Sequence, residues 1–338
     1  MNWRSEVSET ERSGVLEGGL PTPSARLEVG SPYKVLLHGL EYFCRRLPAA
    51  FQSHGWEIRH HSVHQLRSFV PLVRDLSAAD LLFLWGSRIS FGKFLRVARF
   101  FDKKNVVMFW AGSDVLGAQM QFAEGTCEPW IAAKTHWAGA PWLRDEIQAL
   151  GLKCEFVPIT WVPKVERPHP LPERFSVLVY LPDAERAPLY GMERILQVAR
   201  SLPHISFELV GLTNGSVLDP PPNLRMQGRI ADMAEVYRRS SVYWRPVAHD
   251  GLSFMSLEAM SHGRHVIWSY SYPHCRQSRS AETDREEIIR LHDLHQRNLL
   301  SLNESAVAMV AERFSLETIR KDYLRRWEEI ILSSAERR

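Results

Sequence analysis

The chain has 338 residues, of which 45% are hydrophobic and 24% are charged, and its formal net charge is only +3. This length is typical of a two-domain globular protein, and so small a charge gives no support to nucleic-acid binding. The four cysteines have no paired spacing, so we expect neither a zinc site nor a disulfide framework, and we expect a cytoplasmic location.

The first 30 residues differ in character from the rest of the chain. They are polar and lack the apolar stretch of a signal peptide, so residues 1–30 are predicted to form a disordered leader. No segment of the chain reaches the roughly 18 consecutive apolar residues that a membrane-spanning helix needs. We therefore expect the folded part to begin near residue 31.

Short apolar runs alternate with amphipathic segments from residue 33 onward. Strands are predicted at 33–39, 56–62, 79–86, 105–114 and 154–160, and helices at 45–55, 91–104 and 140–151. Strands that alternate with helices indicate βαβ units and a parallel sheet. The first domain is expected to cover residues 31–165.

A proline-rich stretch at 162–175 predicts a linker, after which the same alternation resumes. Strands are predicted at 175–181, 205–211, 242–246 and 265–270, and helices at 192–202, 231–241, 253–263, 281–296, 304–314 and 316–332. We expect a second α/β domain over 166–315 and a last helix in 316–338 that packs back on the first domain. Two doubly wound domains would face a cleft at the carboxyl ends of their strands.

The stretch HDGLSFMSLEAMSHGRHVI, residues 249–267, holds two acids, Asp250 and Glu258, directly after a predicted strand. Ser253 is a suitable N-cap for the helix, and Gly263 is a suitable end for it. The start of such a helix offers free backbone N–H groups to a phosphate.

Glu258 has two interpretations. It can be an ordinary solvated helix position, because acidic residues are frequent on helices. However, its neighbours in the predicted helix are apolar on nearly all sides, so the carboxylate is expected to be partly buried. A partly buried acid usually needs a partner or a ligand.

The segment DGLSFMSLEAMSHGRHVI resembles a signature of the GT-B glycosyltransferases of the family 4 type, also described as glycosyl transferases group 1. In that signature an acid is followed by seven residues, a Glu, and then AM, a glycine and VI. Further similarity runs from about residue 33 to 330, and WAGSD at 110–114 resembles the family's HGSD segment. The resemblance implies a fold of two Rossmann-like domains and an enzyme that needs neither a metal nor a cofactor.

The resemblance also implies roles for individual residues. Asp250 and Glu258 would be the catalytic pair, with Glu258 on the donor ribose and Asp250 near the transferred sugar. Other donor-side residues would be Gly39, Arg186, Tyr190, Arg245, His249, Gly251, Leu252 and Ser253. Ser113 and Asp114 would lie on the acceptor side.

The sequence departs from the family where a cation is expected to meet the diphosphate leaving group. Tyr190 and Gly191 stand where the family has Lys–Gly. Arg186, Arg194 and Arg245 are the candidates to replace the missing charge, and Arg245 is the best placed because it ends a strand just before the donor loop. Negative charge that develops on a leaving group has to be stabilised.

The segment 88–104 is strongly basic and is interleaved with aromatic residues. Its six cations are opposed by a single acid, Asp102. One interpretation is peripheral contact with the anionic inner face of a membrane. The other is an ordinary βαβ helix whose apolar side lies in the core.

Eleven tryptophans are present, and several lie near predicted strand ends. Aromatic rings cover the apolar faces of sugars, so some of Trp85, Trp110, Trp137, Trp142 and Trp161 could line an acceptor site. The others would belong to the core.

The sequence therefore predicts a retaining glycosyltransferase that moves a sugar from a nucleotide-sugar donor to a glycan or lipid-linked acceptor, in surface polysaccharide synthesis. The missing Arg–Lys pair leaves a second hypothesis open. This is a catalytically silent GT-B module that binds a nucleotide sugar or glycan, or that scaffolds a partner enzyme. A nucleotide-sugar epimerase is a third hypothesis, but no motif supports its additional acid and base.

Overall fold

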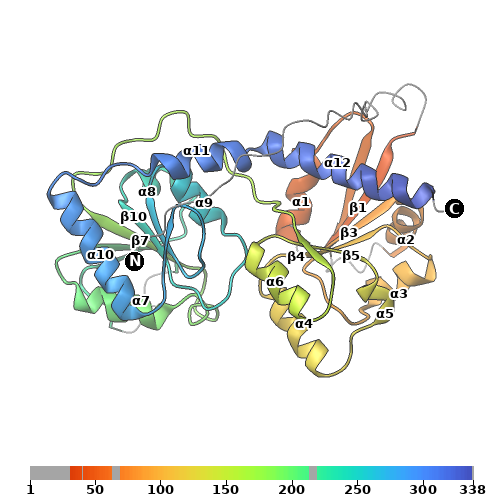
Figure 1. Ribbon diagram of the computed structural model, residues 1–338, viewed down its shortest axis with the longest axis horizontal. Helices are drawn as coiled ribbons and strands as arrows, with labels where there is room; N and C mark the ends of the chain where they lie inside the picture. The colour runs from red at the N-terminus through yellow and green to blue at the C-terminus, as the bar shows by residue number, and fades with distance from the viewer. Residues whose placement is uncertain (1–30, 40, 63–68, 213–218, 337–338) are drawn as a thin grey trace, which may run out of the picture.

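The structure is a computed structural model that describes residues 31–336 except for 40, 63–68 and 213–218. Residues 1–30, for which the sequence predicts a disordered leader, lie outside this description. The described chain forms two six-stranded parallel sheets, each with helices packed on it (Figure 1). The predicted α/β fold with two doubly wound halves is confirmed.

The N-terminal sheet has the strand order β2-β1-β3-β4-β5-β6. Its strands are β1 (Tyr33–Gly39), β2 (Trp56–Ser62), β3 (Leu81–Trp85), β4 (Val106–Trp110), β5 (Thr135–Ala138) and β6 (Cys154–Phe156). The helices of this half are α1 (Glu41–Ala50), α2 (Phe69–Ala78), α3 (Lys93–Phe100), α4 (Asp114–Ala123), α5 (Pro129–Ala132) and α6 (Pro141–Ala149). Both β3 and β4 are buried along their whole length, because side chains of the helices cover both faces of the sheet.

The C-terminal sheet has the strand order β12-β11-β10-β7-β8-β9. Its strands are β7 (Ser176–Leu181), β8 (Ser206–Gly211), β9 (Leu224–Gly228), β10 (Val242–Arg245), β11 (His265–Trp268) and β12 (Cys275–Gln277). The helices are α7 (Met192–Ser201), α8 (Met233–Arg238), α9 (Phe254–Ser261), α10 (Ala281–Gln296) and α11 (Glu304–Arg313).

The last helix, α12 (Leu316–Ala335), returns to the N-terminal half and lies across its sheet (Figure 1). The hydroxyl of Tyr323 donates to the carbonyl of Val157 over 3.1 Å. The buried ring of Trp327 packs edge-on against Phe83, with 5.7 Å between ring centroids. The C-terminal helix therefore belongs to the core of the N-terminal half.

The segment between the two sheets has no regular structure over 157–175 and is anchored by a buried arginine. The guanidinium of Arg264 donates to the carbonyls of His169 and Pro170, at 2.5 and 3.2 Å. Burial lowers the pKa of Arg264 to about 10, because no carboxylate offsets the loss of water. These bonds fix the linker on the C-terminal half.

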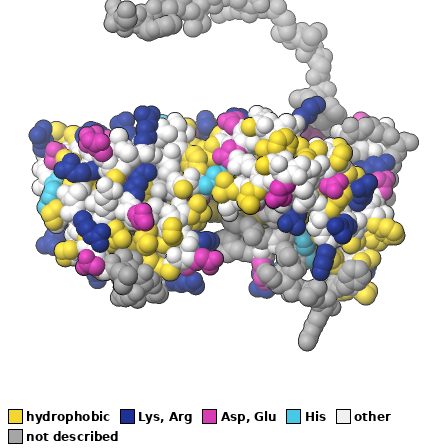
Figure 2. Space-filling model, turned by 90° about the horizontal axis from the view of Figure 1, so that it is seen from below, with side chains coloured by type: hydrophobic (Ala, Val, Ile, Leu, Met, Phe, Trp, Pro, Cys, Tyr) yellow, Lys and Arg dark blue, Asp and Glu magenta, His cyan; other side chains and the backbone are white. Residues whose placement is uncertain are grey.

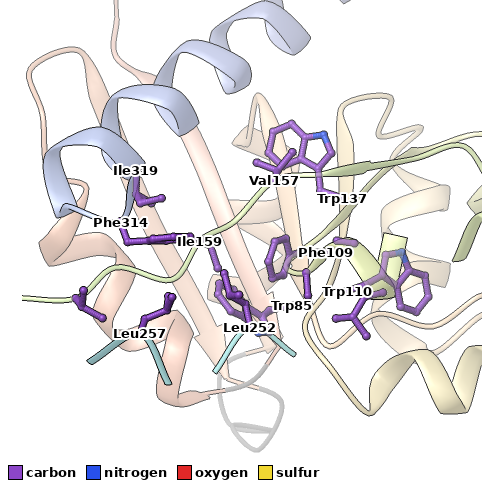
Figure 3. Close-up of a cluster of buried hydrophobic side chains, with 14 of the residues drawn as sticks. Trp85, Phe109, Trp110, Trp137, Val157, Ile159, Leu252, Leu257, Phe314 and Ile319 are labelled. Atoms are coloured by element: carbon purple, nitrogen blue, oxygen red, sulfur yellow. The ribbon is translucent and has the colours of Figure 1, made fainter. Parts of the chain in front are cut away.

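One hydrophobic cluster runs through both halves (Figure 3). It joins strand residues such as Trp85 and Phe109 to Val157 and Ile159 of the linker and to Leu257 of α9. Burial of these side chains holds the two sheets together with the carboxyl ends of their strands toward each other.

Candidate functional site

A buried ion pair forms at the carboxyl end of β10. Arg245, the last residue of the strand, donates from Nε to Oδ2 of Asp250 over 2.6 Å, and from Nη1 to the hydroxyl of Tyr243 over 3.0 Å. The side chains of Arg245 and Asp250 are only 6% and 13% exposed. Burial is the largest single influence and acts to lower the pKa of Arg245, but the charge and hydrogen bond of Asp250, together with the hydroxyls of Tyr243 and Tyr190, hold that pKa well above its usual value.

Aromatic rings surround the Arg245 guanidinium. Its central carbon lies 5.0 Å from the ring centroid of Tyr190 and 5.9 Å from that of Tyr180. In the sequence comparison, Tyr190 stands where the resembling family has a lysine. It presents an aromatic ring to the guanidinium of Arg245 and adds no second positive charge.

The peptide group of Asp250 is held from both halves of the molecule. Its N–H donates to the hydroxyl of Tyr270 over 2.9 Å, and its carbonyl accepts from Nε1 of Trp142 over 2.7 Å. Trp142 lies in the first turn of α6 and stacks on Tyr270, with ring centroids 3.9 Å apart and an interplanar angle of 7°. The predicted catalytic acid is thus positioned by an N-terminal-half side chain.

A second side chain of α6, that of Glu146, contacts the loop that contains Asp250. Nε2 of His249 lies 2.9 Å from Oε2 of Glu146. Glu146 follows Trp142 by four residues, so both side chains project from one face of the helix. His249, predicted to contact the donor, is engaged with the other half instead, and its donor contact stays a prediction.

Two glycines allow the loops after β4 and β10 to touch. A Cβ atom on Gly251 would lie 1.9 Å from the carbonyl oxygen of Ala111, and one on Gly112 would lie 3.3 Å from the nitrogen of Gly251. Gly251, Leu252 and Ser253 are all buried. The loop at 250–251, which directly precedes the predicted phosphate site at the start of α9, is therefore in contact with the loop at 111–112.

The ends of α9 are as predicted. Ser253 is the N-cap, and its Oγ accepts from the N–H of Ser256 over 3.1 Å. Gly263 follows the C-cap with a φ of 73°, a conformation that glycine adopts without strain.

Glu258 lies in the middle of α9 and is partly buried, as its apolar neighbours predicted. The hydroxyl of Tyr237 donates to Oε2 of Glu258 over 2.8 Å. Burial raises the pKa of Glu258 above its ordinary value, while the Tyr237 hydrogen bond and the charge of Arg46 act in the opposite direction. Glu258 does not share the partners of Asp250, so the two acids occupy different environments.

Of the three candidate cations for the leaving group, only Arg245 joins Asp250. Arg186 pairs with Asp183 at 2.7 Å on the surface, and Arg194 pairs with the buried Asp284 at 2.8 Å. The assignment of one of these arginines to a diphosphate stays a prediction. Each of the three already has a carboxylate partner.

The glycine that ends β1 has a structural reason of its own. Gly39 has a φ of 138°, and a Cβ atom there would lie 1.8 Å from the carbonyl oxygen of Trp85. Close packing of β1 on β3 therefore requires a glycine at this position. Its predicted approach to the donor phosphates stays a prediction.

Asp114 stabilises the loop that touches Gly251. Its carboxylate accepts from the N–H groups of Ala111 at 3.0 Å, Gly112 at 2.7 Å and Ser87 at 3.2 Å. Burial raises the pKa of Asp114 to about 6, although these backbone donors act to lower it. Ser113 is exposed and makes no side-chain capping bond. The carboxylate of Asp114 thus fixes the loop at 111–112, an arrangement that we call the loop clamp. The acceptor-side roles of Ser113 and Asp114 stay predictions.

The tryptophans considered for an acceptor site divide into two groups. Trp85, Trp110 and Trp137 are buried in the core, at most 4% exposed, whereas Trp142 and Trp161 are partly buried. Sequence reasoning did not find Glu146, Tyr237 and Tyr270. The only signal for the α6 contact was the position of Trp142 near a strand end.

Two further searches cover only the part of the chain that the structure describes. Within it, no group of three or more His, Cys, Asp or Glu side chains is arranged to hold a metal ion. None of its helices combines the length and apolar character needed to cross a bilayer.

Comparison with solved structures identifies the architecture. HepE from Anabaena in complex with UDP-glucose is similar with a TM-score of 0.65 at 13% identity, over 88% of this chain and 99% of that one. The chain has the GT-B fold. Sucrose-phosphate synthase from Thermosynechococcus elongatus is similar with a TM-score of 0.65 at 12% identity, over 89% of this chain and 100% of that one.

The GT-B likeness extends to a larger enzyme. The pneumococcal O-GlcNAc transferase GtfA, in complex with UDP and GlcNAc, matches with a TM-score of 0.56 at 13% identity. The match covers 77% of this chain, which spans only 60% of the length of that protein. No protein-family model matches the sequence, and the curated proteins contain no match.

Proposed function

We propose that the protein is a retaining glycosyltransferase that moves a sugar from a nucleotide-sugar donor to a glycan or lipid-linked acceptor. The observation that carries this proposal is the position of Asp250. It lies where the two sheets of a GT-B fold meet, with its side chain fixed by Arg245 and its peptide group fixed by Trp142 and Tyr270. A carboxylate held this rigidly can orient the hydroxyl groups of a sugar without reorganisation.

The donor would lie along α9. Glu258 would accept hydrogen bonds from the ribose hydroxyls, and the backbone at the start of α9, after Ser253, would receive the diphosphate. HepE and GtfA were crystallised with UDP or a UDP-sugar, which supports a UDP-type donor, and GDP-sugars are the alternative. His249, Gly251, Leu252 and Tyr190 would complete the donor side, and Ser113 and Asp114 the acceptor side.

Donor entry would require the loops at 111–112 and 250–251 to separate, because their backbones are in contact. Arg245 would supply the positive charge next to the leaving diphosphate, and closing of the two halves would exclude water. Arg186 and Gly39 would contribute only at the edge of this site.

The silent-module hypothesis also has a specific observation in its favour. Arg245 and Asp250 neutralise each other within 2.6 Å, and a tyrosine replaces the lysine that would supply a further charge. A module of this kind would bind a nucleotide sugar or a glycan, or scaffold a partner enzyme, without transferring sugar.

We propose a cytoplasmic location at the inner face of a membrane, a role in surface polysaccharide synthesis, and a reaction without a metal or cofactor. A lipid-linked acceptor would be reached from that membrane face.

Turnover of the donor distinguishes the enzyme from the silent module. Release of UDP from UDP-sugars is followed for the wild type, Asp250→Asn and the control Asp145→Asn, whose carboxylate is exposed on α6. The enzyme hypothesis expects slow release by the wild type and by the control, and a loss of at least a hundredfold in Asp250→Asn. Donor binding without turnover in all three proteins would favour the silent module.

A further inference from the structure

The outer face of α3 carries several positive charges, and the acids near this segment include Asp102, which lies beside Lys104, and Glu128, whose N–H donates to the carbonyl of Ile89. Lys93, Arg96 and Arg99 are exposed along the helix, and Arg88 is exposed in the loop before it. The segment 81–101 contains no Asp or Glu. Among the described residues, none of these four cations forms an ion pair with a carboxylate.

Apolar side chains flank these cations. Phe100, the last residue of α3, is 83% exposed, which is unusual for a large aromatic side chain. Met120 and Phe122 at the end of α4 are 66% and 45% exposed. Gln121 ties them to the approach to α3, because its Oε1 accepts from the N–H groups of Ile89 and Ser90 at 3.0 and 3.1 Å.

The apolar side of α3 is already occupied. Leu95 and Ala98 are buried beneath the helix, in the cluster that also contains Leu36 and Met108 of the sheet. The exposed cations and Phe100 are therefore additional to what a βαβ helix needs for packing. Helices α3, α4 and α5 lie on the side of the N-terminal sheet opposite to α12 (Figure 1). From below, the right-hand half shows Lys and Arg side chains together with Asp and Glu side chains among hydrophobic ones (Figure 2).

We infer that this face, defined here as Arg88, Lys93, Arg96, Arg99, Phe100, Met120 and Phe122, docks on an anionic lipid surface. Unpaired cations lower the free energy of contact with acidic headgroups, and exposed apolar side chains enter the boundary between headgroups and acyl chains. The charge pattern fits an anionic bilayer, whereas a protein groove would leave the scattered cations without partners. The inference deepens the proposed function, on which it rests for the lipid-linked acceptor.

Vesicle co-sedimentation of the full chain tests this face without any sugar donor. Wild type is mixed with phosphatidylcholine vesicles, with or without phosphatidylglycerol, at low salt. We expect binding only to the anionic vesicles. In the triple variant Lys93→Gln, Arg96→Gln, Arg99→Gln, we expect it to weaken about a hundredfold, since each cation contributes roughly fivefold. Phe100→Ser is expected to weaken binding at high salt as well, where charge is screened.

A matched control removes three exposed cations from the C-terminal half. Arg225→Gln, Arg285→Gln, Arg297→Gln changes the net charge equally and should bind like the wild type. The inference is overturned if the wild type ignores anionic vesicles or if both triple variants lose binding alike. It is also overturned if a DNA duplex binds as tightly and depends on the same cations. Donor binding is measured separately, so a failure of the proposed function would be recognised independently.

Discussion

The two acids of the predicted motif differ in how the protein holds them. Asp250 lies in a loop, is paired with a buried cation, and has its peptide group bonded to Tyr270 and to Trp142. Glu258, eight residues later, lies in the middle of α9, where it accepts a hydrogen bond from Tyr237 and burial raises its pKa. The first acid is held by hydrogen bonds from both halves, whereas the second accepts a hydrogen bond from the C-terminal half and is influenced by the N-terminal half through the charge of Arg46.

This difference suggests separate tasks for the two acids of the motif, one in the assembly of the site between the halves and the other in donor binding. A site whose parts come from both halves, such as the one at Asp250, is assembled only when the halves meet. At Glu258 the hydrogen bond comes from Tyr237 of the C-terminal half, and the N-terminal half adds the charge of Arg46, so this site depends less on how the halves meet. Changes at Asp250 should therefore affect stability and closure, and changes at Glu258 should affect donor binding.

Of the substitutions that test this difference, removal of Arg245 should lower the stability of the protein most. Arg245→Met leaves Asp250 nearly buried without its counter-charge, and we expect a loss of about 3–5 kcal/mol in the free energy of unfolding. Urea denaturation measures the loss. The double variant Arg245→Met, Asp250→Asn should recover part of it, and a single variant as stable as the wild type would contradict the account.

The loop clamp at Asp114 should show a pH dependence. Its folded-state pKa, about 6, lies above the ordinary value of 3.8, so the folded protein holds the extra proton between these pH values. The stability that Asp114 contributes is therefore full at acidic pH and is lost as pH rises through about 6.

Asp114→Asn removes this titration. Relative to that variant, the wild type should lose about 3 kcal/mol of stability between acidic and neutral pH. Urea melts of both proteins across this range measure the difference. A constant difference between the two proteins would show that burial does not raise this pKa.

Gly251→Ala should separate the halves. Its new methyl group would meet the carbonyl oxygen of Ala111 at 1.9 Å, so we expect a loss of about 1–3 kcal/mol and a disturbed stack of Trp142 on Tyr270. Near-ultraviolet circular dichroism reports on that stack. Gly117→Ala is the control, because a Cβ atom there meets nothing within 4 Å. An unchanged spectrum in Gly251→Ala would argue against contact between the loops.

Tyr237→Phe should have the smallest effect on stability, and it tests how Glu258, in contrast to Asp250, is held. It removes the hydrogen bond that Tyr237 donates to Glu258, with an expected cost of about 1–2 kcal/mol at neutral pH. The hydrogen bond lowers the pKa of Glu258, so this pKa should rise in the variant. The stability linked to Glu258 is present at acidic pH and falls as pH rises through that pKa. NMR titration of the carboxyl carbon measures the shift, and an unchanged pKa would contradict the assigned partner.

The fold was largely predictable because its longer elements follow simple periodicities. β1 and β2 occupy the predicted ranges 33–39 and 56–62, and α9 is flanked by the predicted N-cap Ser253 and by Gly263, which follows its C-cap. The strands β5, β9 and β12 and the helices α2, α4 and α5 were not predicted. β5 has only four residues, and β9 carries the polar pattern LRMQG, so neither shows a clear apolar run.

The candidate site was predictable only where it is local in sequence. Asp250 and Glu258 belong to one motif, and the cap of α9 has a local chemical signature. Trp142 and Glu146 reach the same loop from more than 100 residues away, and they do so because of how the two halves pack. Periodicity and motifs carry no information on that packing.

Donor binding tests the central claim most directly. Ligand-observed NMR with UDP-, GDP- and dTDP-sugars is recorded for the wild type, Glu258→Ala and the control Glu312→Ala, which removes an exposed acid of α11. The account predicts that one donor binds the wild type and the control and that binding is lost in Glu258→Ala. Equal binding by all three folded proteins, or no binding by the wild type, would contradict the assignment of Glu258 and of the donor site.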